Sequence, residues 1–290
     1  MAQGIFIGLS TIDVVYRLKE FPKKNSKVVA DSQDAYVGGP ATNASITFSQ
    51  LGGRSTLVSA VGRHSMAAFV RDELQKFSVQ LIDVTPDSNE SPTVSSITVD
   101  GTGHRNVISA NGKRVANPSA QVDAHAFDQA KVVMIDGHYP QVCLAWAREA
   151  KTRGVRVVLD AGSWKDGTEE LLKSVDTAIC SADFRPPGCT SDEEVVEFLK
   201  GKGVARIAIT KGPDPVVFSS GLTSGTLRVP AVSAIDTMGA GDVFHGAYCY
   251  FVATGLGFVE ALGEAAEIAA ESCKFHGTRA WANSPQLTSA

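Results

Sequence analysis

Short apolar runs alternate with longer amphipathic stretches along most of this chain. Continuous apolar runs bounded by turn residues predict buried strands at residues 4–9, 55–61, 79–84, 131–136, 155–160, 175–180, 206–210 and 225–232. Helical spacing of apolar residues predicts helices within residues 38–51, 65–77, 122–130, 143–153, 191–202, 243–252 and 258–275. Because such a βα repeat usually forms a parallel sheet covered by helices, the pattern predicts a doubly wound, mostly parallel α/β fold.

Two segments interrupt this alternation. Residues 14–37 show no long helical spacing, and their runs at 28–30 and 35–37 are typical of short strands. Residues 93–99 and 105–109 form a second strand pair around the turn Asp100-Gly101-Thr102-Gly103. We therefore predict a single domain over residues 1–290 that carries β insertions at about 14–37 and 92–113.

Composition narrows the class of protein. With 43% hydrophobic residues, the 290-residue chain has ample material for a core. Its net charge of -4 indicates no basic nucleic-acid footprint, and no uninterrupted apolar run has membrane length. Five scattered cysteines without a C-x-x-C pair predict reduced thiols rather than a metal site. Since no signal peptide is visible, we expect a cytoplasmic protein with neither nucleic acid nor membrane as partner.

The stretch from Asp236 to Asp242 is the strongest candidate for chemistry. Gly239-Ala240-Gly241 leads into a strongly apolar helix, and such a turn leaves backbone N–H groups unpaired at the positive end of the helix dipole. That arrangement predicts an anion site. A carboxylate at Asp242 should repel an anion bound there, so its presence indicates a function that needs a carboxylate and an anion site together. Deprotonating a hydroxyl beside a phosphoryl group is such a function. The alternative is that Asp242 only caps the helix.

Further candidates lie at expected strand ends. Asp13 follows the first strand, at the sheet edge where ligands bind in parallel α/β folds, although an Asx turn would explain it equally well. Asp136 and Asp160 each end a strand and could help to hold magnesium, or simply cap the next turn. Gly38-Gly39-Pro40 suits a helix start that approaches a ligand closely.

These motifs together resemble the ribokinase-like carbohydrate kinases of the PfkB family. Asp236-Thr237-Met238-Gly239-Ala240-Gly241-Asp242 is similar to the family's C-terminal signature, and residues 38–52 are similar to its N-terminal signature. The resemblance implies ATP and Mg²⁺ as cofactors, and it implies that the insertions form a small β lid over a sugar. It also implies residue roles: Asp242 as base with Gly239, Ala240 and Gly241 as anion hole; Asp13, Gly39 and Asn43 for the sugar; Thr210, Gly212, Gly239, Gly241 and Gly277 for the nucleotide.

The sequence also departs from the family. Ser181-Ala182-Asp183-Phe184 stands where many members carry Asn-x-x-Glu to organise magnesium, so the metal ligands stay unassigned. Pro215 occupies the last position of a Thr-x-Gly-x-x-Gly pattern that begins at Thr210. Ser181 resembles the ketohexokinase branch, in which an arginine placed like Arg105 reaches nucleotide or substrate phosphate. The alternative is that Arg105 is a solvated strand residue.

The resemblance predicts an ATP-dependent kinase that phosphorylates a hydroxyl of a small sugar, a ketose such as fructose. Residues 236–247 also resemble the branch that acts on sulfofructose, so an anionic sugar is an alternative. A non-catalytic sugar or nucleotide sensor on the same fold is a further alternative. Exposed strands of the lid could pair in a homodimer.

Overall fold

The main sheet organises the molecule. The computed structural model describes residues 1–110, 112 and 118–284. Its nine main-sheet strands are β1 (Gln3–Ile7), β4 (Arg54–Ser59), β5 (Gln80–Asp83), β8 (Val132–Ile135), β9 (Arg156–Ala161), β10 (Thr177–Ser181), β11 (Arg206–Lys211), β12 (Asp214–Ser220) and β13 (Thr223–Leu227). They lie in the order β13-β12-β11-β10-β9-β8-β1-β4-β5. All neighbours from β11 to β5 are parallel, whereas β12 and β13 are antiparallel additions.

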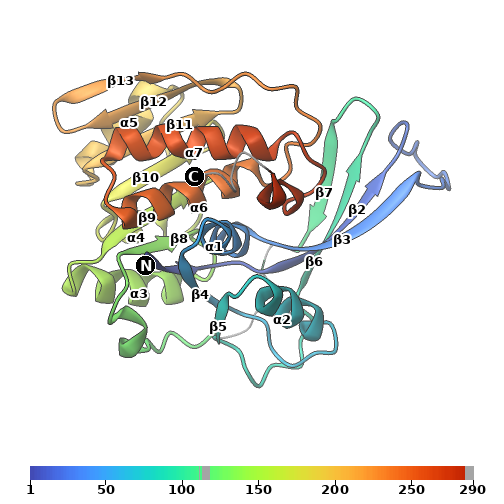
Figure 1. Cartoon of the computed structure of the whole chain (residues 1–290), viewed down its shortest axis with the longest axis horizontal. Coiled ribbons are helices and arrows are strands. Elements are labelled where there is room, and N and C mark those ends of the chain that lie inside the picture. The colour runs from blue at the N-terminus through green and yellow to red at the C-terminus, as the bar shows by residue number, and fades with distance from the viewer. Residues whose placement is uncertain (111, 113–117, 285–290) are drawn as a thin grey trace.

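Helices cover both faces of this sheet (Figure 1). One layer contains α1 (Pro40–Gln50), α2 (Ala67–Lys76), α6 (Ala240–Thr254) and α7 (Phe258–Ser272). The other contains α3 (Pro140–Thr152), α4 (Thr168–Leu172) and α5 (Asp192–Gly201). The described residues also include two short 3-10 helices, η1 (Ala124–Phe127) and η2 (Ala280–Asn283). The arrangement confirms the predicted doubly wound, mostly parallel fold.

Successive residues of the central strands face opposite helical layers. Phe6 of β1 packs with the layer of α1, α6 and α7, whereas Ile5 and Ile7 pack with the layer of α3, α4 and α5. All three side chains are fully buried. A strand buried on both faces has no polar side, which is why these strands read as continuous apolar runs in the sequence.

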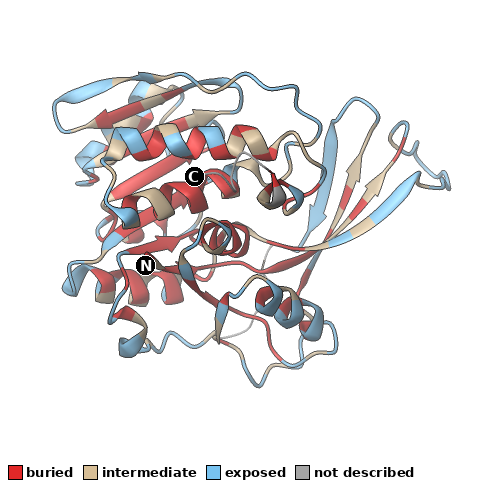
Figure 2. Cartoon of the chain, in the orientation of Figure 1, coloured by how far each residue is buried: buried red, intermediate tan, exposed pale blue. Residues whose placement is uncertain are grey.

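A second, four-stranded sheet projects from this body (Figure 1). We call it the small sheet: β2 (Thr11–Arg17), β3 (Ser32–Gly38), β6 (Thr93–Val99) and β7 (Arg105–Ser109), in the order β3-β2-β6-β7. Both predicted insertions contribute to it. Every residue of β7 is exposed, and Figure 2 shows this exposure along the whole strand.

Some predicted elements are wrong. The run at 28–30 lies in no strand, because Val28 and Val29 are exposed to solvent, and β2 forms instead at Thr11–Arg17. The helix predicted at 122–130 is only the single turn η1, which the Asp123 carboxylate caps through the His125 N–H and which buries Phe127 alone. The strand predicted at 225–232 ends earlier, at Leu227, while β12 and α4 have no counterpart among the predicted elements. The end of the second insertion, residues 111 and 113, lies outside the described residues.

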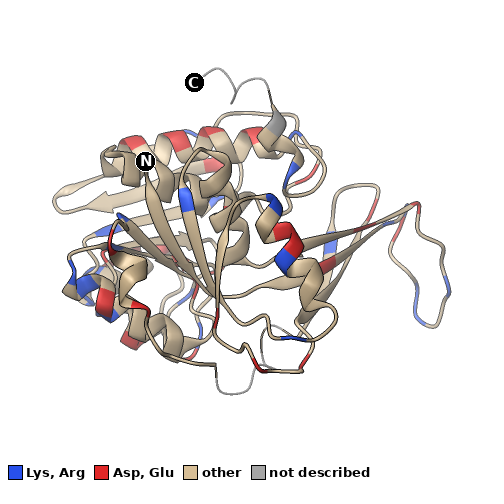
Figure 3. Cartoon of the chain, turned by 60° about the horizontal axis from the view of Figure 1, so that its bottom comes forward, with Lys and Arg blue, Asp and Glu red and all other residues tan. Residues whose placement is uncertain are grey.

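Basic and acidic residues are interspersed over the elements in the view of Figure 3. Across the described residues, no helix is both long and apolar enough to cross a lipid bilayer. Cys143, Cys180, Cys189, Cys249 and Cys273 are all free thiols.

Candidate active site

The first turn of α6 exposes backbone donors. Gly239 precedes the helix in the left-handed region, with φ 70°, and a Cβ there would lie 2.6 Å from the Thr278 methyl carbon. Within the described part of the chain, the N–H groups of Gly239, Gly241 and Asp242 have no acceptor. The Ala240 N–H differs, because it donates to the Thr237 carbonyl at 3.3 Å and closes the turn. The donors available to an anion are therefore those of Gly239, Gly241 and Asp242.

A hydrogen-bond chain across three elements fixes the Asp242 carboxylate. Asn43 Nδ2 donates to Asp242 Oδ2 at 2.6 Å, and Arg279 Nη1 donates to Asn43 Oδ1 at 2.9 Å. Because a guanidinium only donates, it holds the Asn43 oxygen on its own side and turns the amide NH₂ toward Asp242. The predicted sugar-contact residue Asn43 thus also orients the predicted base.

The environment of Asp242 disfavours its charge. Burial, followed by the Asp160 carboxylate, raises the pKa of Asp242 to about 7, while the bond from Asn43 and the proximity of His245 act in the opposite direction. Asp13 adds a smaller upward contribution, which places it in the same cluster. A carboxylate with a pKa close to neutral is suited to accept a proton from a hydroxyl and release it afterwards.

His245 lies one turn further along α6, with acceptors on both sides of its ring. Nδ1 is 2.7 Å from the Gly241 carbonyl oxygen, and Nε2 is 3.2 Å from the Ile179 carbonyl oxygen and 3.6 Å from Asp160 Oδ1. A neutral imidazole would direct a lone pair at one of these oxygens, whereas the imidazolium donates to both. Both ring nitrogens therefore face oxygen atoms of the fold, which hold the imidazole in place on α6 below Asp242.

Asp13 lies on β2, at the base of the small sheet. Thr11 Oγ1 donates to Asp13 Oδ1 at 2.7 Å, and burial raises the pKa of Asp13. A Cβ on Gly38 would lie 1.9 Å from Asp13 Oδ2, so this glycine leaves the space that the carboxylate occupies. Gly39 has φ 98°, and a Cβ there would lie 2.2 Å from the Leu9 carbonyl oxygen. Both glycines bring the start of α1 close to the predicted sugar position.

Asp236 links the small sheet to the C-terminal loop. Its Oδ2 accepts from Arg17 of β2 and from the Gly277 N–H, each at 3.0 Å, and its Oδ1 accepts from the Met238 N–H at 2.9 Å. A Cβ on Gly277 would lie 2.8 Å from the Tyr36 ring of β3. Gly277, which the resemblance assigns to the nucleotide, therefore has a structural contact with the small sheet.

Arg105 does not join the cluster. It starts β7 opposite Val99, whereas Asp13 pairs with Ser95, four residues further along β6. At about 3.3 Å per residue this offset is roughly 13 Å. The exposed Arg105 thus lies toward the outer end of the small sheet, away from the carboxylates.

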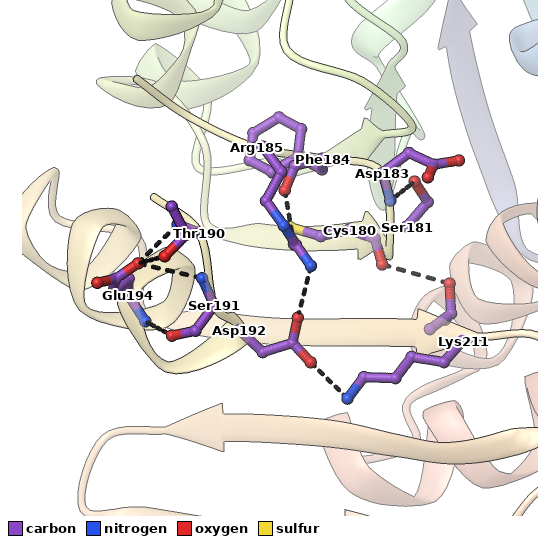
Figure 4. Close-up of polar contacts among 11 residues, drawn as sticks. Cys180, Ser181, Asp183, Phe184, Arg185, Thr190, Ser191, Asp192, Glu194 and Lys211 are labelled. Atoms are coloured by element: carbon purple, nitrogen blue, oxygen red, sulfur yellow. Dashed lines mark hydrogen bonds and ion pairs between the residues drawn. The ribbon is translucent and has the colours of Figure 1, made fainter. Parts of the chain in front are cut away.

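The loop after β10 is bonded within the fold (Figure 4). Ser181 Oγ donates to the Gly162 carbonyl at 2.7 Å and accepts from the Asp183 N–H at 3.1 Å. Thr210 Oγ1, on the adjacent β11, donates to the Cys180 carbonyl at 3.3 Å. The side chains of Ser181 and Thr210 therefore shape this edge of the sheet, where the resemblance predicts the nucleotide.

Asp192 at the start of α5 joins two cations beside this loop. It pairs with Arg185 at 3.0 Å and with Lys211, as Figure 4 shows. Lys211 is the largest influence that lowers the pKa of Asp192. Gly212 follows in an exposed turn with no atom within 4 Å of the position a Cβ would take. The place of Gly212 at the nucleotide site stays a prediction.

Asp136 has a structural role. Its Oδ2 accepts from the Leu9 N–H at 2.8 Å and the Ala41 N–H at 3.3 Å, and its Oδ1 accepts from the His138 N–H at 2.9 Å. A Cβ on Gly8 would lie 2.0 Å from this carboxyl group. The side chain thus joins the ends of β1 and β8 to the start of α1. Among the described residues, no group of three His, Cys, Asp or Glu side chains forms a ready metal site.

Arg279, which no sequence motif singles out, ties this cluster together. It donates to Glu73 Oε1 at 3.1 Å and to the Val37 carbonyl at 2.5 Å, in addition to its bond to Asn43. Burial lowers its pKa, and the Glu73 carboxylate opposes that effect. A lone arginine followed by Ala280-Trp281 carries no signal of function, and its partners become neighbours only in the fold.

The comparison with known families decides the assignment. The sequence profile described as "pfkB family carbohydrate kinase" matches residues 1–285. The chain belongs to the PfkB family of carbohydrate kinases. It is accordingly a phosphotransferase that acts on sugar hydroxyls, and its predicted family, fold and enzyme class are confirmed.

Individual relatives are distant but cover nearly the whole kinase. A ribokinase of Lactococcus lactis is 24% identical over 268 residues, covering 90% of this chain and 87% of the relative. An ATP-dependent ribose-1-phosphate kinase of Halopiger xanaduensis is 25% identical over 269 residues, covering 88% and 86%. The structure of Arabidopsis thaliana ribokinase complexed with ribose and ATP superposes with a TM-score of 0.81 at 21% identity, covering 95% of this chain and 93% of that one.

Proposed function

We propose that this PfkB-family kinase transfers the terminal phosphoryl group of ATP to a hydroxyl of a small neutral sugar, with Asp242 as the general base. One observation carries the proposal: a carboxylate whose pKa is raised to about 7 lies in the same helical turn as N–H groups without acceptors. A capping role alone would not account for the pairing, since the Asp242 side chain accepts from Asn43 and from no N–H of its own helix in the described residues.

In the proposed step, Asp242 takes the proton of the sugar hydroxyl as the oxygen attacks the terminal phosphorus of ATP. The new O–P bond forms while the bond to the bridging oxygen breaks, and ADP leaves with that oxygen. The N–H groups of Gly239 and Gly241 stabilise negative charge on the transferring group. Asp242 then releases its proton to solvent.

The sugar would lie between the small sheet and the start of α1. Asp13 offers carboxylate oxygens to sugar hydroxyls, and Asn43 retains one amide N–H beyond its bond to Asp242. The small sheet would act as the lid, with Arg17 and Asp236 as its connection to the body. Closure over the sugar would exclude water, which otherwise competes as phosphoryl acceptor.

The charges around the cluster favour a neutral sugar over an anionic one. The cations nearest to it in the hydrogen-bond network, Arg279 and Arg17, are already paired with carboxylates. Ser181 is the residue on which the prediction of a ketose substrate depends, and its hydroxyl donates to a carbonyl within the fold. An activity assay is therefore needed to distinguish fructose from ribose as the substrate. The ribose-1-phosphate kinase relative makes an anionic sugar the second candidate.

The site fits ATP and Mg²⁺ as the cofactors of this family. Gly241 is exposed, with open space where a Cβ would lie, so its N–H can be approached by a phosphate. Magnesium usually retains several waters and binds one or two carboxylates together with substrate phosphates. Asp242 and Asp160 are the carboxylates closest to such a position, and bound Mg²⁺ would supply charge neutralisation on the phosphates.

The decisive experiment is an ADP-release screen over fructose, ribose, other neutral sugars and their phosphorylated or sulfonated analogues. We expect turnover with a neutral sugar and a kcat that is about 10²- to 10⁴-fold lower for Asp242→Asn, the range lost when a general base is removed. The amide oxygen of the variant can still accept from Asn43, so the fold should persist, which circular dichroism would check.

Asp166→Asn is the matched control, because Asp166 is exposed and takes part in none of the described site contacts. It should keep normal turnover. Turnover within about threefold of normal in Asp242→Asn would exclude Asp242 as the base. Sugar and ATP binding without ADP release by the unmodified protein would instead support the sensor alternative.

A further inference from the structure

A cavity of about 90 Å³ lies at the edge of the main sheet opposite the Asp242 cluster, where the parallel strands begin. Its lining includes Arg156 at the start of β9, Thr177 at the start of β10 and Arg206 at the start of β11. Tyr248 of α6 and Gly257 before α7 also line it, and the apolar side chains of Val252, Leu256 and Phe258 complete the lining. We call this space the basic cavity.

Sheet register explains why the two arginines flank one space. Thr177 pairs with Val158 of β9 and with Arg206 of β11. Arg156 precedes Val158 by two residues and therefore points to the same face of the sheet. Two strand spacings of about 4.8 Å, together with the two-residue offset of about 7 Å along the strands, separate the two arginine Cα atoms by roughly 12 Å, with Thr177 on the strand between them.

Neither arginine is neutralised. The Arg206 guanidinium has no hydrogen-bond or ion-pair partner in the described part of the chain, and Arg156 has only a 3.4 Å contact with the Val252 carbonyl. Among the described residues, the nearby carboxylates of Asp176 and Glu260 form no ion pair with either arginine; Asp176 accepts from the Val157 N–H, and Glu260 accepts from the Gly257 N–H. By contrast, Arg17 and Arg279 near the Asp242 cluster are each paired with a carboxylate.

The phenol of Tyr248 adds a neutral donor to the same space. Tyr248 is 1% exposed, and burial raises its pKa to about 12, against a hydrogen bond with the Thr177 side chain and the smaller opposing influences of Arg206 and Arg156. The hydroxyl is thus protonated at physiological pH and lies close enough to both guanidinium groups to sense their charge. Two cations and two hydroxyls converge on one small hollow.

We propose that the basic cavity binds a small oxyanion, either inorganic phosphate or the phosphoryl group of a small metabolite. Arginine presents a fork of N–H donors that matches phosphate oxygens, and two unpaired arginines also supply the charge. The volume of the basic cavity, about 90 Å³, limits the ligand to a small ion or a single phosphoryl group, because pockets for whole drug-sized ligands span about 300–1,000 Å³. Solvated arginines at strand starts are common, but these two share a hollow with a hydroxyl between them.

The test maps phosphate binding by amide NMR of the full-length, ¹⁵N-labelled protein. Sodium phosphate is titrated at constant ionic strength, with sodium chloride as the reference titration. We expect saturable shifts at Thr177, Arg206 and Gly257, and at least a tenfold weaker response in the double variant Arg156→Gln/Arg206→Gln. Arg54→Gln is the matched control, since Arg54 also starts a strand at this edge and lies outside the cavity.

Each outcome is decisive, and none depends on turnover. Shifts confined to residues 239–242 would place phosphate only at the first turn of α6 and overturn the proposal, as would an equal response to chloride or an unchanged response in the double variant. A parallel titration with fructose 1-phosphate separates the two sources. A response to inorganic phosphate alone identifies the free ion, and tighter binding of the ester identifies a metabolite.

Discussion

Asp242 is a carboxylate whose position favours its protonated form. Two other carboxylates, Asp160 from β9 and Asp13 from β2, face it, while His245 on its own helix and Arg279 from the C-terminal loop provide the nearby positive charges. Burial is the largest influence and sets the direction of the shift. The consequence is a base that is half ionised near neutral pH, where its proton affinity matches the task.

The first prediction follows from the sign of that shift. Only ionised Asp242 can accept the hydroxyl proton, so kcat/KM for the sugar should fall about tenfold per pH unit below about 7 and level off above it. Initial rates at saturating ATP and Mg²⁺ between about pH 5.5 and 9 would measure this. A profile that stays flat from about pH 5.5 to 8 would contradict it.

His245→Gln is the companion variant for that profile. Loss of the imidazole should raise the pKa of Asp242 further, because His245 is one of the groups that lowers it. The acid limb should then move to higher pH, while Asp166→Asn leaves it in place. A variant with lower rates but an unmoved limb would assign His245 a purely structural role.

Single residues also show what the sequence can and cannot predict. Asp242 and its glycines stand together in the chain, so the sequence alone reveals their pairing. It does not reveal the role of Arg279, because Val37, Asn43 and Glu73 lie more than 200 positions away and reach it only through the fold. For Arg105, strand register places the start of β7 toward the outer end of the small sheet, so its contact with substrate or phosphate stays a prediction of the resemblance.

At the scale of elements, the strength of the apolar pattern decides how well each span is predicted. The predicted spans of β6 and β7 coincide with the observed ones, since a clear turn separates two β-rich runs. Strand β2 escapes prediction because its residues alternate poorly, with Asp13 and Val14 both half-buried. Strand β2 is stabilised by pairing with β3 and β6, and a local sequence pattern contains no information about such partners.

The second prediction concerns the contact between β3 and β2. Gly38→Ala would place a Cβ 1.9 Å from Asp13 Oδ2, a separation that atoms cannot adopt, so the carboxylate must rotate away. Under the proposed function, the KM for the sugar should rise at least tenfold with a smaller change in the KM for ATP. Steady-state kinetics with each substrate varied in turn would show the difference.

Gly101→Ala is the control for this variant. Gly101 also belongs to the small sheet's connections, but its Cβ would lie 3.3 Å from the Lys19 carbonyl oxygen, a contact that a slight shift relieves. It should leave both KM values within about twofold. An unchanged KM for the sugar in Gly38→Ala, with the protein folded, would remove Asp13 from the proposed sugar site.

At the scale of the whole molecule, two of the contacts between the small sheet and the body involve the same pair of loops. Arg17 reaches Asp236, and Gly277 approaches Tyr36, so both contacts involve the loops that flank α6 and α7. The base and the small sheet therefore share one set of loops. The sequence indicates both the insertions and the helix, but their juxtaposition depends on segments more than 200 residues apart.

The third prediction is a homodimer through the small sheet. In the described residues β7 pairs only with β6, and it exposes Val107 by 55% and Ile108 by 75%. Exposed apolar side chains on an outer strand invite pairing with a second copy. In a two-fold dimer Ile108→Lys acts twice, and losing about 1.5 kcal/mol per isoleucine gives roughly 3 kcal/mol, a Kd about 100-fold weaker. Light scattering after gel filtration should therefore show a dimer for the unmodified protein and a monomer for Ile108→Lys.

Leu222→Lys is the control for this variant, because Leu222 is an exposed leucine on the opposite edge of the molecule, and this variant should remain dimeric. A monomeric unmodified protein at about 50 μM would contradict the prediction.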